Sequence, residues 1–287
     1  KSKETDYTGG NVDADGYNRT ADAFEKDLEM YYKEGYRMIR LNDYIDGKVD
    51  VDAGKSPLIL TFDDGHANNI LVKGKDENGE LEIDPKSAVG ILEKFKEKYP
   101  DFNVTATFFI NQTKFNQPKY DDEIIKWLVK HGYDVGNHTA SHPDLTEITQ
   151  KETNDEVGVV YDLLEEVIPG KYVKIVALPF GSPYQYDHEN MKKVYDCKYN
   201  GKKYHTKSAL QVAWEPDESP YSKKFTPSFL KRIRGYDNGG EYFDIEYTFT
   251  LLESTRYISD GDVKTCVVPK DKKDLIDKKF KKQIKTY

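Results

Sequence analysis

Leu58-Ile59-Leu60-Thr61-Phe62-Asp63-Asp64-Gly65-His66 is an apolar run that ends abruptly in two adjacent carboxylates. Its first five residues suit a short buried strand, and Asp is depleted within β structure, so the strand should end at Phe62. Side chains of neighbouring residues in an extended chain point to opposite sides. We therefore expect Asp63 and Asp64 to have different roles, one as a metal ligand and the other facing a substrate. The alternative is that one of them only caps the following turn.

Further apolar runs, at residues 104–110, 133–135 and 173–178, also suit strands, and helices are predicted between them. The first predicted helix has Phe24 and Leu28 on its apolar face and ends at Gly35. A second helix is predicted to begin with Asp84 as N-cap and Pro85 as its first residue. The others are predicted around residues 124–131 and, from a capping-box pattern, 149–168. This alternation predicts an α/β fold with a mostly parallel sheet, either a closed barrel or an open doubly wound sheet.

The pattern is weaker after residue 200. Residues 208–214 suit a strand, 241–253 are ambiguous between helix and strand, and the Lys-rich end suits a peripheral amphipathic helix. We therefore divide the chain into a flexible lead-in over 1–18, a single barrel domain over 19–269 and a charged C-terminal helix or tail over 270–287. The polar insertion at residues 72–84 follows the first acidic strand end, so we expect it on the catalytic face.

Composition excludes some functions. The chain has 287 residues and a formal net charge of −8, which argues against a nucleic-acid-binding surface. It contains no apolar run of 18 residues, and its polar, Gly-rich start is typical of a processed secreted or lipid-anchored protein, or of a trimmed chain. Cys197 and Cys266 are more readily two idle thiols than a disulfide.

A second polar cluster, Asn137-His138-Thr139-Ala140-Ser141-His142-Pro143, follows the predicted strand at 133–135. Histidines at i and i+4 share one face of a helical turn and can bind one ion, although two surface histidines would give the same spacing. Together with one carboxylate they form a set that suits catalytic zinc and also non-haem iron. The spare carboxylate, Asp63, favours hydrolysis, because it can take a proton from the attacking water.

A third cluster, Leu178-Pro179-Phe180-Gly181-Ser182-Pro183, follows the strand at 173–178. Pro and Gly fix a turn here and expose its backbone N–H groups, which can stabilise an oxyanion. By itself this cluster would also fit an ordinary turn at the end of a strand.

In this order, the three clusters resemble the carbohydrate esterase family 4 polysaccharide deacetylases, which share the NodB homology domain. The family's first motif, TFDDG, stands unchanged at 61–65, and its second, H-[ST]-x-x-H, is matched at 138–142. The third, R-x-P-[YF], has Ala177 in place of the Arg, as in some exopolysaccharide or poly-N-acetylglucosamine deacetylase branches. The resemblance implies a distorted (β/α) barrel and a divalent ion, commonly Zn²⁺.

The resemblance also implies roles for residues at the matching positions. Asp63 is the catalytic base, and the backbone N–H of Phe180 helps to bind the oxyanion. Asp64, His138 and His142 are the metal ligands, and Pro179 belongs to the third motif.

Two departures from the family pattern leave positions open. The Arg that pairs with the catalytic Asp is absent, and Arg232 and Arg234 are candidates to replace it, although both would also fit a basic surface turn. The late L-x-H motif, whose His is the general acid, has no counterpart, because no histidine follows His205. His66 could face the cleft, whereas His188 and His205 lie in polar loops.

The expected function is removal of N-acetyl groups from a cell-wall polysaccharide or exopolysaccharide that contains N-acetylglucosamine, outside the cell or at its surface. A membrane tether through a removed or lipidated N-terminus would fit. The alternatives are a catalytically impaired carbohydrate-binding protein on the same fold and, far less favoured, an iron oxygenase, because those enzymes usually have all-β folds.

Overall fold

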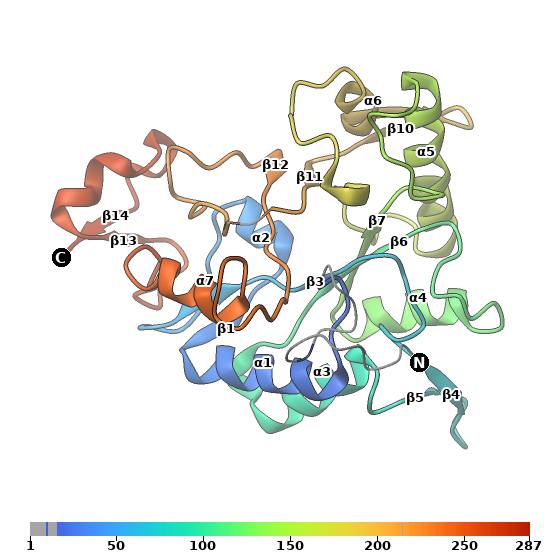
Figure 1. The fold of residues 1–287 in the computed structure, drawn as a ribbon, viewed down its shortest axis with the longest axis horizontal. Coiled ribbons are helices and arrows are strands. Elements are labelled where there is room, and N and C mark those ends of the chain that lie inside the picture. Colours follow the sequence, from blue (N-terminus) through green and yellow to red (C-terminus); the bar gives the residue numbers. More distant parts are fainter. Residues whose placement is uncertain (1–9, 11–15, 214) are drawn as a thin grey trace.

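The computed structural model describes residues 10, 16–213 and 215–287, so Trp214 and most of the predicted lead-in lie outside the described residues. At its centre is a six-stranded parallel sheet in the order β12-β11-β8-β7-β6-β3 (Figure 1). From one edge to the other these strands are β3 (Thr61–Phe62), β6 (Thr107–Ile110), β7 (Asp134–Asn137), β8 (Ile175–Ala177), β11 (Ser208–Leu210) and β12 (Phe229–Leu230). The carboxyl ends of these strands therefore meet at one edge of the sheet.

The predicted strand at 58–62 is divided in two. β1 (Tyr36–Met38) and β2 (Ser56–Leu58) form a separate parallel pair, and β3 begins only at Thr61. The carbonyl of Leu58 accepts from Ile39 N, whereas that of Leu60 accepts from Thr107 N. The chain thus changes its hydrogen-bonding partner from β1 to β6 within two residues, a tertiary effect that a continuous apolar run does not reveal.

The four longer helices cover the outside of the sheet (Figure 1). The longer ones are α1 (Ala21–Lys33), α3 (Ala88–Lys98), α4 (Asp121–Lys130) and α5 (Gln150–Val167), and the shorter ones are α2 (Leu41–Ile45), α6 (Met191–Tyr195) and α7 (Ile245–Leu252). The capping box of Thr149 and Glu152 is confirmed at α5. The predicted start of α3 is wrong, because Ser87 caps it and Asp84 instead closes a turn by accepting from Lys86 N.

The sheet curls until its two edge strands approach one another. β3 and β12 lie at opposite ends of the strand order, yet Arg232, two residues beyond β12, donates to Thr61 of β3. Apolar side chains fill the inside of the curl, and α2 contributes Leu41 and Ile45 to them. The predicted distorted (β/α) barrel is therefore confirmed, and the open doubly wound alternative is wrong.

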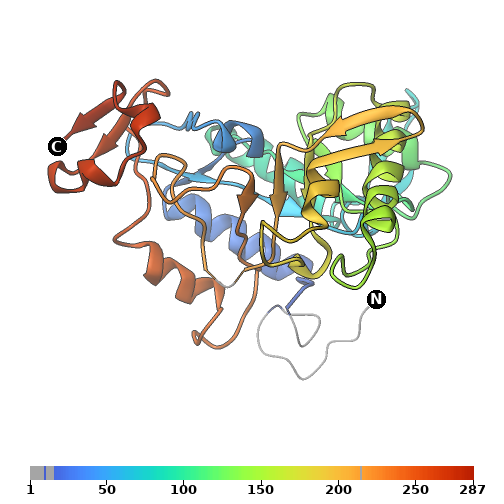
Figure 2. The ribbon, with the colours of Figure 1, turned by 90° about the horizontal axis from the view of Figure 1, so that it is seen from above.

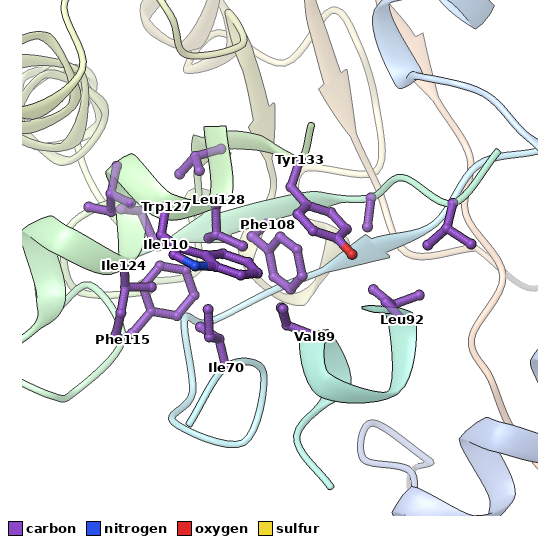
Figure 3. Packing of buried hydrophobic residues seen from close by; sticks show 14 of the residues in the cluster. Ile70, Val89, Leu92, Phe108, Ile110, Phe115, Ile124, Trp127, Leu128 and Tyr133 are labelled. Carbon is purple, nitrogen blue, oxygen red and sulfur yellow. The ribbon is translucent and has the colours of Figure 1, made fainter. Parts of the chain in front are cut away.

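The largest apolar cluster lies on the outer side of the sheet, against α3 and α4 (Figure 3). Phe108 of β6 is fully buried and stacks on Phe62 of β3 with ring centroids 4.9 Å apart. Trp127 of α4 and Tyr133, which precedes β7, pack beside it. Large buried rings of this kind fix the strand ends that carry the polar clusters, because a close-packed core tolerates little displacement.

The C-terminal segment differs from the predicted helix. It forms β13 (Cys266–Val268), two 3₁₀ turns, η3 (Lys270–Leu275) and η4 (Lys278–Phe280), and β14 (Ile284–Thr286) at the periphery of the fold (Figure 2). β14 pairs with β13, so this small sheet includes residues on both sides of the boundary predicted at residue 269. Phe280 is buried whereas Leu275 is exposed, so the apolar residues do not form one stripe. Asp277 also caps η4 and interrupts the helical path.

The polar insertion forms the hairpin of β4 (Val72–Lys75) and β5 (Leu81–Ile83). Lys75 pairs with Glu123 in the first turn of α4, and Glu80 at the hairpin tip pairs with Lys130 in its last turn. The hairpin thus runs along α4 toward the opposite end of the sheet. Our expectation that the insertion extends over the catalytic face is wrong.

The remaining features settle smaller points. The ambiguous stretch at 241–253 contains α7, and a second hairpin joins β9 (Asp196–Tyr199) to β10 (Lys202–His205). Cys197 and Cys266 are free and buried in separate clusters, as expected of idle thiols. Among the described residues, no helix is long and apolar enough to cross a lipid bilayer.

Asp244 holds the end of the loop that runs from β12 to α7. It caps α7 by accepting from Glu246 N and also accepts from the N–H groups of Asn238 and Gly240. Burial opposes its ionisation, but these backbone hydrogen bonds keep the pKa of Asp244 below its ordinary value. A lowered carboxyl pKa stabilises the fold above the unfolded-state pKa, and this contribution is lost as the pH falls through the folded-state pKa.

We predict that Asp244→Ala lowers the free energy of unfolding by about 1–2 kcal/mol at pH 7, the range for a lost N-cap. Urea unfolding at pH 7 and at pH 3 measures the difference between the variant and the wild type. The difference should shrink at pH 3. An equal difference at both pH values would contradict the assigned ionised cap.

Candidate active site

The three polar clusters meet at the carboxyl ends of the parallel strands. Asp63 and Asp64 directly follow β3, and His138 directly follows β7. Phe180 lies just beyond β8, and Arg232 lies two residues beyond β12. Because the strands are parallel and curled, residues separated by as many as 169 positions converge here.

Asp64, His138 and His142 form a group whose ligand atoms all lie within 4.8 Å of one another. Asp64 Oδ1 is 3.3 Å from His138 Nε2 and 3.5 Å from His142 Nε2. Two imidazole nitrogens and one carboxylate oxygen suit a divalent transition metal and leave coordination positions open. The donor set and its spacing therefore fit a metal ion.

The histidine loop is not the helical turn that the i, i+4 spacing suggested. Thr139 and His142 have positive φ values of 62° and 61°, so left-handed residues turn the chain between the two rings. Asn111 Nδ2 donates to the carbonyls of both His138 and Thr139, at 2.8 and 2.9 Å. The backbone N–H and the hydroxyl of Ser141 both donate to the carboxylate of Glu156. The rings converge because this network holds the loop.

The tautomer of His138 is fixed by a backbone carbonyl. His138 is almost fully buried, and its Nδ1 lies 2.8 Å from the carbonyl oxygen of Ala177. A carbonyl only accepts, so Nδ1 carries the hydrogen and, in the neutral ring, Nε2 keeps a lone pair toward Asp64. This arrangement, a ligand histidine oriented through its second nitrogen, is common at metal sites.

The first cluster is also held in a strained conformation. Asp64 has a φ of 69° and is followed by Gly65 at 60°. A Cβ on Gly65 would lie 1.9 Å from the carbonyl oxygen of Lys114, so only glycine fits there. A left-handed non-glycine residue costs about 1–3 kcal/mol and is concentrated at functional sites.

Asp63 is paired with Arg232, one of the two arginines proposed from the sequence. Nη1 and Nη2 of Arg232 donate to Oδ1 and Oδ2 of Asp63, each at 2.8 Å. Nη1 also donates to Thr61 Oγ1 at 3.1 Å, and Nε donates to the carbonyl of Gln211 at 3.3 Å. A forked pair of this kind fixes the plane of the carboxylate. Arg232 therefore makes the contact to Asp63 that Ala177 cannot make.

Burial and neighbouring charges have opposing effects on the pKa values of most ionisable groups in the site. Burial opposes ionisation of Asp63, but the charge of Arg232 holds the pKa of Asp63 below its ordinary value. Burial likewise opposes ionisation of Asp64, but the neighbouring imidazoles of His138 and His66 lower its pKa. Burial disfavours a charged His138, yet the carboxylates of Asp63 and Asp64 raise its pKa. Burial and the charge of His138 lower the pKa of His142.

Phe180 occupies a tight turn, η2 (Pro179–Gly181), with a φ of 56°. The N–H groups of Gly181 and Ser182 donate within the turn, to the carbonyls of Leu178 and Pro179. In the part of the chain that the structure describes, no group accepts from the N–H of Phe180. The Phe180 ring meets the His142 ring edge-on, with centroids 4.6 Å apart. The turn is thus adjacent to the metal-ligand group.

Other predicted residues lie at varying distances from this centre. His66 Nε2 is 3.5 Å from Asp64 Oδ2, and Pro179 is buried in the turn. Arg234 lies over the rings of Tyr17 and Tyr236, whereas Arg232 pairs with Asp63. Two further histidines named from the sequence contact residues elsewhere: His188 accepts from Asn190 N, and His205, in β10, pairs with Asp196.

One cavity lies away from this site. It has a volume of about 530 Å³ and is lined by residues that include Ile45, Lys207 and Ser228. Lys207 and Ser228 immediately precede β11 and β12, so this cavity lies at the opposite end of the strands.

Sequence reasoning missed the groups that support the predicted residues. These are Asn111, Glu156, the carbonyls of Ala177 and Gln211, and the hydroxyl of Thr61. Asn111 follows the end of β6, so the strand-end rule could have identified it. Backbone carbonyls leave no signal in residue type.

Comparison with known proteins relates the chain to polysaccharide deacetylases. The polysaccharide deacetylase family matches residues 50–201. The peptidoglycan-N-acetylglucosamine deacetylase of Bacillus cereus is 32% identical over 130 residues, which cover 44% of this chain and 37% of that protein. The peptidoglycan-N-acetylmuramic acid deacetylase PdaC of Bacillus subtilis is 29% identical over 131 residues, 46% of this chain and 23% of that protein. The matched region thus spans well under half of either relative.

A solved structure supports the fold over a larger share of the chain. The Streptococcus pyogenes deacetylase PplD, solved in complex with acetate, aligns with a TM-score of 0.53 and 19% identity. The alignment covers 75% of this chain and 80% of that one.

We predict that the chain binds one divalent ion through Asp64, His138 and His142. His138→Ala should weaken Zn²⁺ binding by more than about 10-fold, since even an outer-shell change commonly costs that much. Equilibrium dialysis against Zn²⁺ measures the affinity, and His205→Ala, which changes an exposed histidine outside the group, is the control. Equal affinities for the two variants would overturn this ligand assignment.

Proposed function

Since the chain belongs to the polysaccharide deacetylase family, we propose that it is a metal-dependent hydrolase that removes N-acetyl groups from an N-acetylglucosamine-containing polysaccharide. The observation that carries this proposal is the Asp64, His138 and His142 group with a second, ion-paired carboxylate beside it. One acidic residue can hold an ion while its neighbour remains available for proton transfer. This division of roles is what the hydrolysis of an amide requires.

The proposed ion is Zn²⁺, held by Asp64, His138 and His142, whose nitrogen and oxygen donors suit it. When bound, such an ion polarises the acetyl carbonyl and lowers the pKa of a water molecule. The buried His138, oriented by Ala177 O, offers its Nε2 lone pair without rearrangement. Family membership also argues against the iron-oxygenase interpretation.

Asp63 is the proposed base. Arg232 keeps it ionised and fixes its carboxylate plane, and Asp63 Oδ2 lies 3.9 Å from His138 Nε2. An ionised carboxylate in this position can accept a proton from the attacking water while the oxygen–carbon bond to the acetyl group forms. The C–N bond then breaks as the proton held by Asp63 passes to the leaving nitrogen, which releases acetate and leaves an amine on the sugar.

The N–H of Phe180 is the proposed donor to the developing oxyanion. It belongs to a turn that is rigid before the reaction, since Gly181 and Ser182 close it with their own N–H groups. A donor that needs no reorientation stabilises charge most effectively in the transition state.

The proposed substrates are cell-wall polysaccharide or exopolysaccharide, and the proposed location is outside the cell or at its surface. Support comes from two relatives, both of which are peptidoglycan deacetylases. The formal net charge of −8 argues against a nucleic-acid substrate. A catalytically impaired binding protein is less favoured, because Arg232 restores a partner to Asp63.

We predict that the Zn²⁺-loaded protein releases acetate from N-acetylglucosamine oligomers and that Asp63→Asn lowers kcat by about 10²- to 10⁴-fold, the range for general-base catalysis. Enzymatic quantification of acetate measures the rate, and Asp196→Asn, which changes an exposed carboxylate in β9, is the control. Binding of oligomers with no acetate release from peptidoglycan, chitin or exopolysaccharide fragments would instead favour the carbohydrate-binding alternative.

A further inference from the structure

The loop that follows β8 exposes three aromatic rings within seven residues. Phe180, Tyr184 and Tyr186 are 52%, 63% and 64% exposed. Exposed apolar side chains are common singly, but a group of them commonly marks a binding surface. The rest of the loop is polar or consists of Gly and Pro, so these rings are not remnants of a buried face.

This aromatic loop is joined to the metal-ligand group. The Phe180 ring packs edge-on against the His142 ring, at 4.6 Å between centroids. Ser182 Oγ donates to Asp144 Oδ1 at 2.7 Å, and Asp144 lies two residues after His142. The loop and the histidine segment therefore hold each other in place, and the exposed Phe180 ring lies at the rim of the candidate active site.

Tyr184 is held in position while its ring stays exposed. Its hydroxyl donates to the carbonyl oxygen of Phe180 at 2.9 Å, which uses the donor of the phenol within the loop. What Tyr184 offers to a partner is therefore mainly the face of its ring. A ring that is already ordered loses little conformational entropy on binding.

We propose that Tyr184 is a sugar-stacking residue, and that it binds the sugar ring next to the one that loses its acetyl group. The inference rests on the proposed function. A pyranose ring presents C–H groups on one face, with a small positive charge, and the face of an aromatic ring is negative. An ordered aromatic ring beside the metal-ligand group thus fits a neutral saccharide chain, and selects oligomers over single sugars.

The test compares the acetylated monomer and the tetramer of N-acetylglucosamine as substrates. Tyr184→Ala should raise KM for the tetramer roughly 10-fold, the size expected for the loss of one well-packed aromatic contact. KM for the monomer should change less than about twofold. Tyr184→Phe, which keeps the ring and loses only the hydrogen bond to Phe180, should retain most of the tetramer affinity. Tyr287→Ala is the matched control, because Tyr287 is 71% exposed at the peripheral C-terminus.

Calorimetric titration with the tetramer separates failure of this inference from failure of the proposed function. If the wild type releases no acetate but Tyr184→Ala weakens tetramer binding relative to Tyr287→Ala, the stacking role holds and the proposed activity fails. If the wild type releases acetate and the Tyr184→Ala and Tyr287→Ala variants have the same KM for the tetramer, the stacking role is overturned. An equal rise in KM for monomer and tetramer would also overturn it, since it would indicate a general distortion of the Phe180 turn.

Discussion

The forked ion pair between Arg232 and Asp63 joins the two edges of the curled sheet. β3 and β12 share no backbone hydrogen bonds in the sheet, because they lie at opposite ends of the strand order. Arg232 spans the gap by donating to Asp63, to Thr61 and to the carbonyl of Gln211 beyond β11. One guanidinium thereby closes the barrel at its carboxyl end and orients the carboxylate proposed as the base.

The same ion pair helps to explain how two adjacent carboxylates can both be ionised in a partly buried site. Asp63 and Asp64 repel each other when both are ionised, and burial penalises each charge. Arg232 compensates Asp63, while the histidines compensate Asp64, so each carboxylate has its own partner. Removal of one partner of such a pair commonly costs more than the pair contributes, because the other charge is left unpaired. The proposed division between a metal ligand, Asp64, and a base, Asp63, is thus consistent with the charges that compensate each carboxylate.

Part of this arrangement could be predicted from the sequence. Asp63, Asp64, His138 and Phe180 follow apolar runs, and the strand-end rule predicts that such residues converge. The helical turn at 138–142 was wrong, because left-handed residues there depend on hydrogen bonds from Asn111, which is distant in sequence. Arg232 and Arg234 differ by two positions, and only the course of the chain beyond β12 decides which of them reaches Asp63. The prediction of a C-terminal helix was wrong because Ile284 pairs with Cys266 of β13, and this tertiary contact outweighs the helical periodicity of the sequence.

A double-mutant cycle on the free energy of unfolding tests the central claim most directly. The variants Asp63→Asn, Arg232→Met and their combination, compared with the wild type by urea unfolding at pH 7, give the coupling energy of the pair. A direct ion pair that closes the barrel predicts a favourable coupling of about 1–3 kcal/mol. Additive effects, with a coupling below about 0.5 kcal/mol, would show that Arg232 and Asp63 act independently and would contradict this account.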